Sequence, residues 1–154
     1  MNPIRVMAKL TEQTPKPEGV GGINEYDLAT CAALCRGIPR PAYLSARLTW
    51  CLDWSVATEL EYLLWVEAAG LAARERWRIP KGREYVRRMS GLAIAETADP
   101  KRWKDQISRC EFVGIGESEW SRTWRERYEG VFGILRDWND DAYRAIQRAQ
   151  IVLD

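Results

Sequence analysis

Large apolar residues toward the C-terminal end of the chain follow one another at the spacing of an α-helix. Between Glu117 and Asp137 they are separated by four, four, three, three and one positions, in the order Trp120, Trp124, Tyr128, Val131, Ile134 and Leu135. Because residues three and four positions apart share a helix face, this spacing predicts one amphipathic helix of about twenty residues. No alternating Val/Ile/Thr segment competes with the helical pattern. The chain is therefore expected to be all-α.

Residues that typically begin and end helices separate similar apolar runs in the rest of the chain. The predicted helices cover 26–36, 41–66 (as one helix or a helix pair), 85–95, 100–113, 117–137 and 140–153. Asn24, Asp99 and Asn139 are their predicted N-caps, and Gly37 and Gly114 their predicted ends. Together they predict a single compact helical domain, 24–154, of six to seven helices. The Pro- and Gly-containing segment 1–23 is expected to be an irregular N-terminal arm.

The length of 154 residues, with 46% apolar residues, is typical of one domain that buries its own core. The N-terminus shows no apolar signal segment, and no window approaches the length of a membrane-spanning helix. Four cysteines do not indicate an oxidised, disulfide-stabilised scaffold. A soluble cytoplasmic protein that does not engage a membrane is therefore expected.

The chain contains no histidine, which excludes Ser-His-Asp triads, Cys-His pairs and His-ligated metals. The segment GVGG at 19–22 lacks the lysine and the strand of a phosphate-binding loop. Zinc binding by Cys31, Cys35, Cys51 and Cys110 is left open, but these residues suit a helical core and lack paired Cys-x-x-Cys spacing. No enzyme activity, metal or cofactor is expected.

A net charge of +1 conceals a basic block, because residues 74–109 contain eleven basic and five acidic residues. A strongly basic link lies between Gly70 and Pro80, and Trp77 within it is a candidate functional aromatic residue. Candidates for phosphate contact are Arg74, Arg76, Arg78, Lys81, Arg83, Arg87, Arg88, Lys101, Arg102 and Lys104. The alternative is a solvated face whose charges pair with Glu75 and Glu84. Double-stranded DNA is the partner that the basic block predicts.

The stretch RCEFVGIGESEWSRTWRERY, residues 109–128, has the pattern of a helix-turn-helix within about 100–137. Cys110 is the small residue of the first helix, Gly114 lies in the turn, and Trp120 and Trp124 provide the inner face of the second helix. The outward positions, predicted to reach base edges or phosphate, are Glu117, Ser118, Ser121, Arg122 and Arg125. The alternative is an αα-hairpin that only packs, with its arginines in solvent.

Three stretches resemble the phage late-gene antitermination proteins of the Q type and their relatives that control bacterial lysis cassettes. They are YDLATCAALCRGIPRPAYLSARLTWCLDW, PKGREYVRRMSGLAIAE and RCEFVGIGESEWSRTWRERYEGVFGILRDWNDDAYRAI, and the last carries the resemblance. The resemblance implies a factor that binds DNA beside a promoter, engages RNA polymerase holoenzyme and sigma factor, and promotes read-through of terminators. It also implies that the helix with Ser118, Ser121, Arg122 and Arg125 reads DNA. This chain lacks the Cys-x-x-Cys zinc insertion that some of these proteins carry.

Two other functions fit the sequence pattern. One is an ordinary helix-turn-helix repressor or activator, which terminator read-through would distinguish from an antiterminator. The other is a helical packaging or assembly module of the small terminase type, which predicts a large ring in solution.

Overall fold

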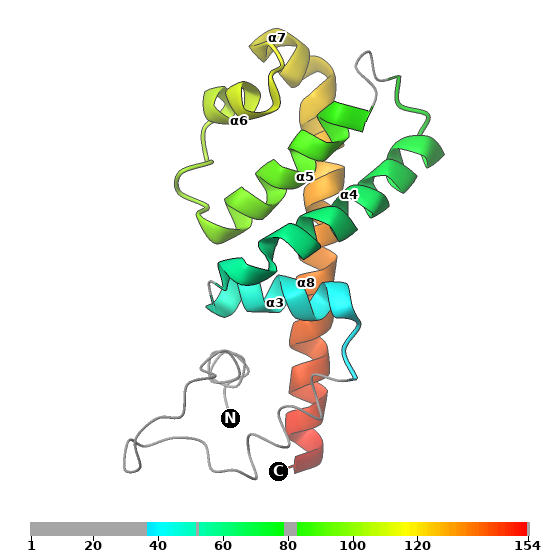
Figure 1. The fold of residues 1–154 in the computed structure, drawn as a ribbon, viewed down its shortest axis with the longest axis vertical. Coiled ribbons are helices and arrows are strands. Elements are labelled where there is room, and N and C mark those ends of the chain that lie inside the picture. Colours follow the sequence, from blue (N-terminus) through cyan, green and yellow to red (C-terminus); the bar gives the residue numbers. More distant parts are fainter. Residues whose placement is uncertain (1–36, 52, 79–82, 154) are drawn as a thin grey trace. The chain divides into compact units, whose positions relative to one another are not determined.

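The computed structural model describes residues 37–51, 53–78 and 83–153, and within these ranges the chain is helical with no strand (Figure 1). The elements are α3 (Arg40–Cys51), the 3-10 turn η1 (Trp54–Val56), α4 (Ala57–Arg74), α5 (Arg83–Ala98), α6 (Gln106–Val113), α7 (Glu117–Glu119), the π-helical turn η2 (Trp120–Trp124) and α8 (Arg125–Leu153). The all-α prediction is confirmed for this part of the chain. The predicted arm 1–23 and the predicted helix 26–36 lie outside the described residues.

The described ranges contain five helices of eight residues or more, whereas six to seven helices were predicted for the domain. The helix predicted over 117–137 is confirmed as the run of α7, η2 and α8. The separate last helix capped by Asn139 is wrong, since α8 continues through this residue to Leu153. On both sides of Asn139 the apolar residues keep helical spacings of three and four positions, in the order Leu135, Trp138 and Ala142. This periodicity outweighs the local preference of asparagine for a cap.

The predicted helix start at Asp99 and Pro100 is also wrong. The Asp99 carboxylate accepts the Arg102 backbone N–H at 3.4 Å within a turn, and α6 begins only at Gln106. Its N-cap is Asp105, whose carboxylate accepts the Ile107 backbone N–H at 3.3 Å. Both aspartates accept hydrogen bonds from backbone N–H groups, but only Asp105 precedes a helix. The local sequence does not determine which of the two becomes the N-cap.

The predicted central segment 41–66 is a helix pair, α3 and α4, separated by η1. The second helix of the pair does not end near Gly70 but continues to Arg74. A Cβ on Gly70 would lie 3.3 Å from Arg74 Nη1, so the glycine leaves room for the arginine side chain to fold back along α4. The basic link predicted between Gly70 and Pro80 is therefore helical in its first part.

The described residues form two compact units, and the chain passes from one to the other between Val56 and Ala57 and again within α8 after Asp137. One unit contains α3, η1 and the part of α8 from Trp138 onward. Its buried cluster consists of Ile38, Ala42, Ala46 and Ala142, with Tyr43, Trp138 and Ala145 packed against it. The expectation of one helical domain over 24–154 stays a prediction.

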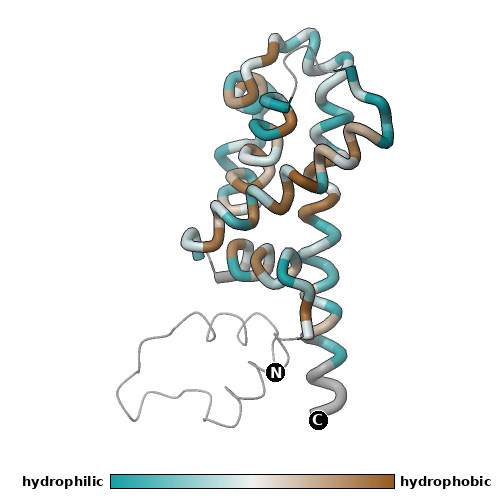
Figure 2. Tube along the Cα trace, turned by 45° about the vertical axis from the view of Figure 1, so that its right-hand side comes forward, coloured by the Kyte–Doolittle hydropathy of each residue, from teal (hydrophilic) through white to brown (hydrophobic). Residues whose placement is uncertain are grey.

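The other unit, Ala57–Asp137, contains α4, α5, α6, α7, η2 and the first part of α8. Figure 2 shows hydrophobic and hydrophilic residues alternating along α4 and α5, as expected for helices that bury one face. The largest fully buried side chains of this unit are Leu60, Leu64, Met89, Leu92, Trp120, Trp124 and Leu135. The two buried tryptophans, Trp120 and Trp124, therefore fix the inner face of the helical run that follows α6 in the core of this unit.

Candidate nucleic-acid interface

A short turn, Gly114–Gly116, joins α6 to α7. Gly114 lies in the left-handed region at φ +81°, and its N–H bonds to the Cys110 carbonyl oxygen at 2.8 Å. Ile115 N–H donates to the same oxygen at 3.1 Å, and its side chain is buried. The prediction that the helix ends at Gly114 is therefore confirmed. Glycine suits this position because a Cβ is disfavoured at positive φ.

Arg88 of α5 fixes the end of α6 from outside. Its Nη1 donates to the Val113 carbonyl oxygen at 3.1 Å, and its Nη2 forms an ion pair with Glu84 at 2.6 Å. A Cβ on Gly114 would approach Arg88 Nη1 to 2.8 Å. Arg88 was predicted to contact phosphate, but the structure uses its guanidinium to hold α6 against α5.

The helical run that follows the turn has a buried face and an exposed face. Trp120 and Trp124 are buried; the Trp120 ring lies 5.6 Å from Tyr128, and the Trp124 ring 5.2 Å from Tyr85. The side chains predicted to face DNA are all exposed: Glu117, Ser118, Ser121, Arg122 and Arg125. Ser121 also accepts a 2.6 Å hydrogen bond from Gln106 Nε2 of α6, so its hydroxyl contributes to the packing of the two helices.

A buried polar network that sequence reasoning missed supports this helix. Glu96 of α5, only 9% exposed, accepts hydrogen bonds from Arg109 of α6 and from the Tyr128 hydroxyl of α8. Arg109 Nε also donates to the Trp103 carbonyl oxygen at 2.8 Å. Burial, and next the hydrogen bond to Glu96, raise the pKa of Tyr128 far above its usual value, so the phenol stays neutral. The sequence contains one signal of this network, because Glu96 falls on the same face of α5 as its buried apolar residues.

We call residues Arg74–Arg78, at the end of α4, the basic segment. Trp77 N–H bonds to the Ala72 carbonyl oxygen at 2.9 Å and Arg76 N–H to that of Ala73 at 3.3 Å, the pattern of a Schellman cap. Arg76 occupies the left-handed position of this cap, at φ +55°, and is the one described non-glycine residue with positive φ. The side chains of Arg74, Arg76 and Arg78 are exposed.

Arg127 of α8 connects the basic segment to the helix after the turn. Its guanidinium carbon lies 4.6 Å from the ring centroid of Trp124 and 5.4 Å from that of Trp77. Its Nη1 donates to the Arg78 carbonyl oxygen at 3.4 Å. Trp77, predicted as a candidate functional aromatic residue, therefore packs against Arg127. Sequence reasoning did not single out Arg127.

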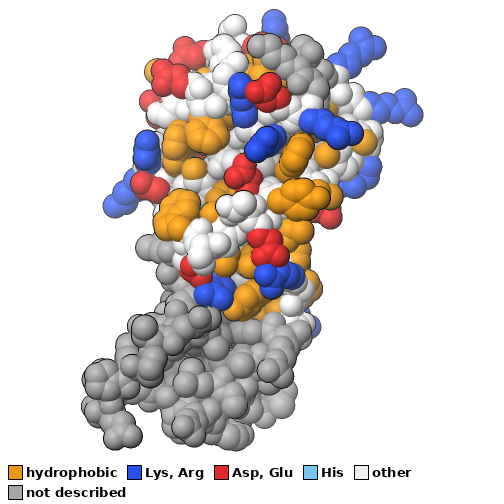
Figure 3. Space-filling model, viewed as in Figure 1, with side chains coloured by type: hydrophobic (Ala, Val, Ile, Leu, Met, Phe, Trp, Pro, Cys, Tyr) orange, Lys and Arg blue, Asp and Glu red, His pale blue; other side chains and the backbone are white. Residues whose placement is uncertain are grey.

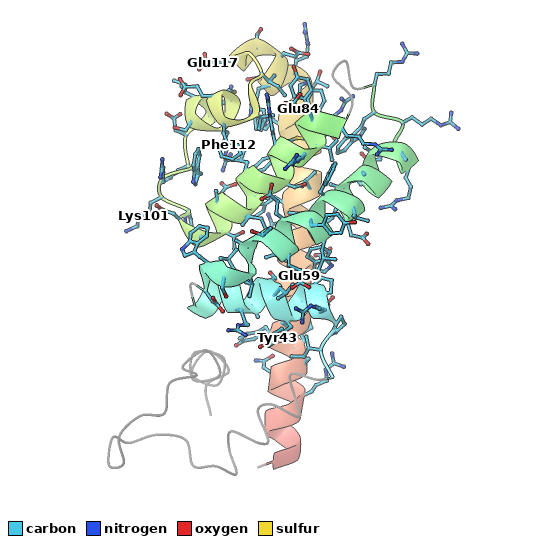
Figure 4. All side chains as sticks on the ribbon, viewed as in Figure 1. Tyr43, Glu59, Glu84, Lys101, Phe112 and Glu117 are labelled. Atoms are coloured by element: carbon cyan, nitrogen blue, oxygen red, sulfur yellow. The ribbon has the colours of Figure 1, made fainter. Side chains whose placement is uncertain are left out.

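The structure separates the other predicted basic residues into two groups at opposite ends of α5. Arg83 and Arg87 lie in its first turns, and the Arg87 guanidinium carbon is 5.6 Å from the centroid of Trp65. Lys101, Arg102 and Lys104 lie beyond its other end, as the labels of Glu84 and Lys101 in Figure 4 indicate. A helix of 16 residues is roughly 24 Å long. Lys81 lies outside the described residues.

Charge is distributed unevenly over this surface. The exposed residues Glu117, Glu119 and Glu126 outnumber Arg122 and Arg125 on the helix after the turn. Arginine side chains instead extend from the end of α4 and the start of α5, at the upper right of Figure 3. Exposed positive charge therefore lies mainly in the basic segment, at the start of α5 and at residues 101–104, and not on the helix after the turn.

Cys110, one of the residues for which zinc binding was left open, is a buried free thiol of α6. Burial raises the pKa of this thiol above its usual value. Within the described ranges, no group of three side chains of the metal-ligating types comes together. Cys31 and Cys35 and the side chain of Cys51 lie outside the description.

Models of protein families, curated proteins and solved structures provide no match to this chain. No helix in the described part of the chain has the length and apolarity needed to cross a membrane.

Proposed function

We propose that α6, the turn Gly114–Gly116 and the helical run from Glu117 form a helix-turn-helix that binds double-stranded DNA. The observation that carries the proposal is the division of the second helix into two faces. Trp120 and Trp124 anchor it in the core, whereas Ser118, Arg122 and Arg125 are exposed on its outer side. A helix that reads the major groove needs such a rigid inner face and a free outer face.

The exposed side chains suit different parts of a DNA duplex. The forked guanidinium groups of Arg122 and Arg125 match the paired acceptors of guanine, and the Ser118 hydroxyl can donate or accept. Glu117 can accept from the amino group of cytosine. The basic segment contacts phosphate in this proposal, and the Arg127 contacts support its placement beside the same helix. The positive charge of the basic segment thus offsets the negative charge of the glutamates on the helix after the turn.

We further propose that the DNA-binding unit belongs to a transcription antitermination factor. The resemblance of residues 109–146 to the Q-type proteins supports this, and it implies contacts with RNA polymerase holoenzyme and sigma factor. The protein acts by binding in this proposal and needs neither a cofactor nor a catalytic group.

Replacing Arg122 and Arg125 together by alanine tests the DNA-binding surface. Fluorescence anisotropy with duplex DNA taken from the region upstream of the protein's own gene is expected to show at least about tenfold weaker binding. Helix content by far-ultraviolet circular dichroism stays unchanged, because both side chains are exposed. The matched control replaces Arg144 and Arg148, which are two exposed arginines further along α8, by alanine. Equal losses in both double variants would refute the assignment of the surface.

Transcription assays with purified RNA polymerase holoenzyme test the more specific function. Templates carrying a terminator downstream of the bound promoter are expected to yield more read-through product when the protein is added. DNA binding that changes initiation without read-through would instead indicate a repressor or activator. A large ring by light scattering, with no effect on transcription, would favour the assembly module.

A further inference from the structure

We propose that the basic segment Arg74–Arg78 is a preorganised phosphate-binding site, with Arg76 as its central contact and Arg127 as its positioning residue. The inference rests on the proposed DNA binding and identifies which of the many basic residues carry it. Three observations support it: the conformation of Arg76, the packing of Arg127 and the charge of the segment.

Arg76 occupies a position at which glycine is the usual residue. In a Schellman cap the residue after the helix adopts the left-handed conformation, which a side chain with a Cβ disfavours. Arg76 nevertheless holds φ +55°, fixed by its own N–H bond to Ala73 and by that of Trp77 to Ala72. A non-glycine residue held in this disfavoured conformation points to a functional role for its side chain.

The segment is held rigid by contacts from α8. The guanidinium carbon of Arg127 lies within cation–π distance of the rings of both Trp77 and Trp124, and Nη1 donates to the Arg78 carbonyl oxygen. Trp124 is fully buried, so these contacts tie the basic segment to the core. A planar guanidinium can stack on two rings and donate in its own plane at once, which a lysine ammonium cannot do.

The segment also presents a clear excess of positive charge. Arg74, Arg76 and Arg78 are exposed, and Glu75 is the single acid among them. The Glu75 carboxylate accepts a 2.8 Å hydrogen bond from the Trp77 indole N–H, so it is engaged within the segment. The capped backbone keeps three guanidinium groups within one short segment, and each can form charge-assisted hydrogen bonds to phosphate oxygens.

Arg76→Gly separates the role of the side chain from its effect on stability. We expect the melting temperature to rise by about 3 °C, because glycine relieves the backbone strain. The salt dependence of binding to duplex DNA is expected to weaken, with the slope of log K against log salt reduced by about one. The control Arg144→Gln removes one exposed positive charge from α8 and leaves the slope unchanged.

Arg127→Lys tests the positioning role while it keeps the positive charge. Loss of the cation–π contacts and of the bond to Arg78 is expected to weaken DNA binding several-fold at constant helix content. Wild-type affinity in this variant would refute the positioning role. A lower melting temperature or an unchanged salt slope for Arg76→Gly would refute the role of Arg76, whereas the Arg122/Arg125 surface would stand. No binding of duplex DNA by the wild-type protein would refute the proposed function itself, and this inference with it.

Discussion

At the scale of single residues, the most demanding feature is the Glu96 carboxylate buried in the unit Ala57–Asp137. A buried charge is tolerated only when charged or hydrogen-bonding groups surround it. Arg109 supplies the opposite charge and the Tyr128 hydroxyl supplies a second donor. Glu96, Arg109 and Tyr128 belong to α5, α6 and α8, so one carboxylate of α5 holds both helices of the candidate interface. Removal of one donor should therefore destabilise the unit without altering its exposed surface.

Tyr128→Phe removes the donor and keeps the ring that packs against Trp120 and Phe132. We expect the free energy of unfolding to fall by about 1–2 kcal/mol, because Glu96 is left with an incompletely satisfied carboxylate. Urea unfolding followed by circular dichroism measures the change. Tyr62→Phe is the matched control, since Tyr62 is 59% exposed, and its effect should stay below about 0.5 kcal/mol. Equal changes in both variants would show that the network does not contribute.

At the scale of elements, the geometry of the candidate interface depends on how α6 ends. Gly114→Ala places a Cβ at φ +81°, where it also meets the Arg88 side chain that holds the Val113 carbonyl. We expect a loss of about 1–2 kcal/mol in the free energy of unfolding.

The same substitution in the middle of a helix provides the control for Gly114→Ala. Gly133 lies within α8, and a Cβ there would meet no atom within 4 Å. Gly133→Ala should therefore stabilise the protein by about 0.5–1 kcal/mol. Opposite signs for the two glycines in thermal unfolding are the expected result. Stabilisation by both would mean that the turn tolerates a side chain.

The sequence predicted the elements well where apolar spacing was long and regular. The run from Trp120 to Leu135 is helical, with Trp120 and Trp124 buried and Arg122 and Arg125 exposed, as its period implied. Local capping signals were less informative. Asp99 was predicted as a cap where Asp105 takes that role, because either aspartate can satisfy a backbone donor in a turn.

Contacts between distant residues account for what the sequence did not predict about the site. The Glu96 carboxylate and the Tyr128 hydroxyl are brought together by the packing of α5 and α8, and no local pattern connects them. The same holds for Arg127 and the basic segment, which are about fifty residues apart in the chain. An arginine in an amphipathic helix carries no mark that distinguishes a positioning role from a solvated one.

At the scale of the whole molecule, the absence of histidine and the neutral total charge have different consequences. The net charge of +1 gives no overall attraction to DNA, so binding must depend on where the arginines lie. The absence of histidine removes the side chain that ordinarily changes charge between pH 5.5 and 7.0. DNA binding by this protein should therefore be sensitive to salt and insensitive to pH in that range.

The shifted pKa values of three described groups strengthen this expectation. The hydrogen bond from Ser55 lowers the pKa of Asp53, so it stays ionised, and burial raises the pKa values of Cys110 and Tyr128, so they stay neutral. Affinity for duplex DNA, measured by anisotropy at fixed ionic strength, is expected to vary by less than about twofold from pH 5.5 to 7.0. A rise in salt at constant pH should weaken it steeply, which serves as the positive control. Tenfold tighter binding at pH 5.5 would contradict the prediction, because it would require proton uptake by an acidic group at the interface. The acidic side of the helix, rather than its arginines, would then control binding.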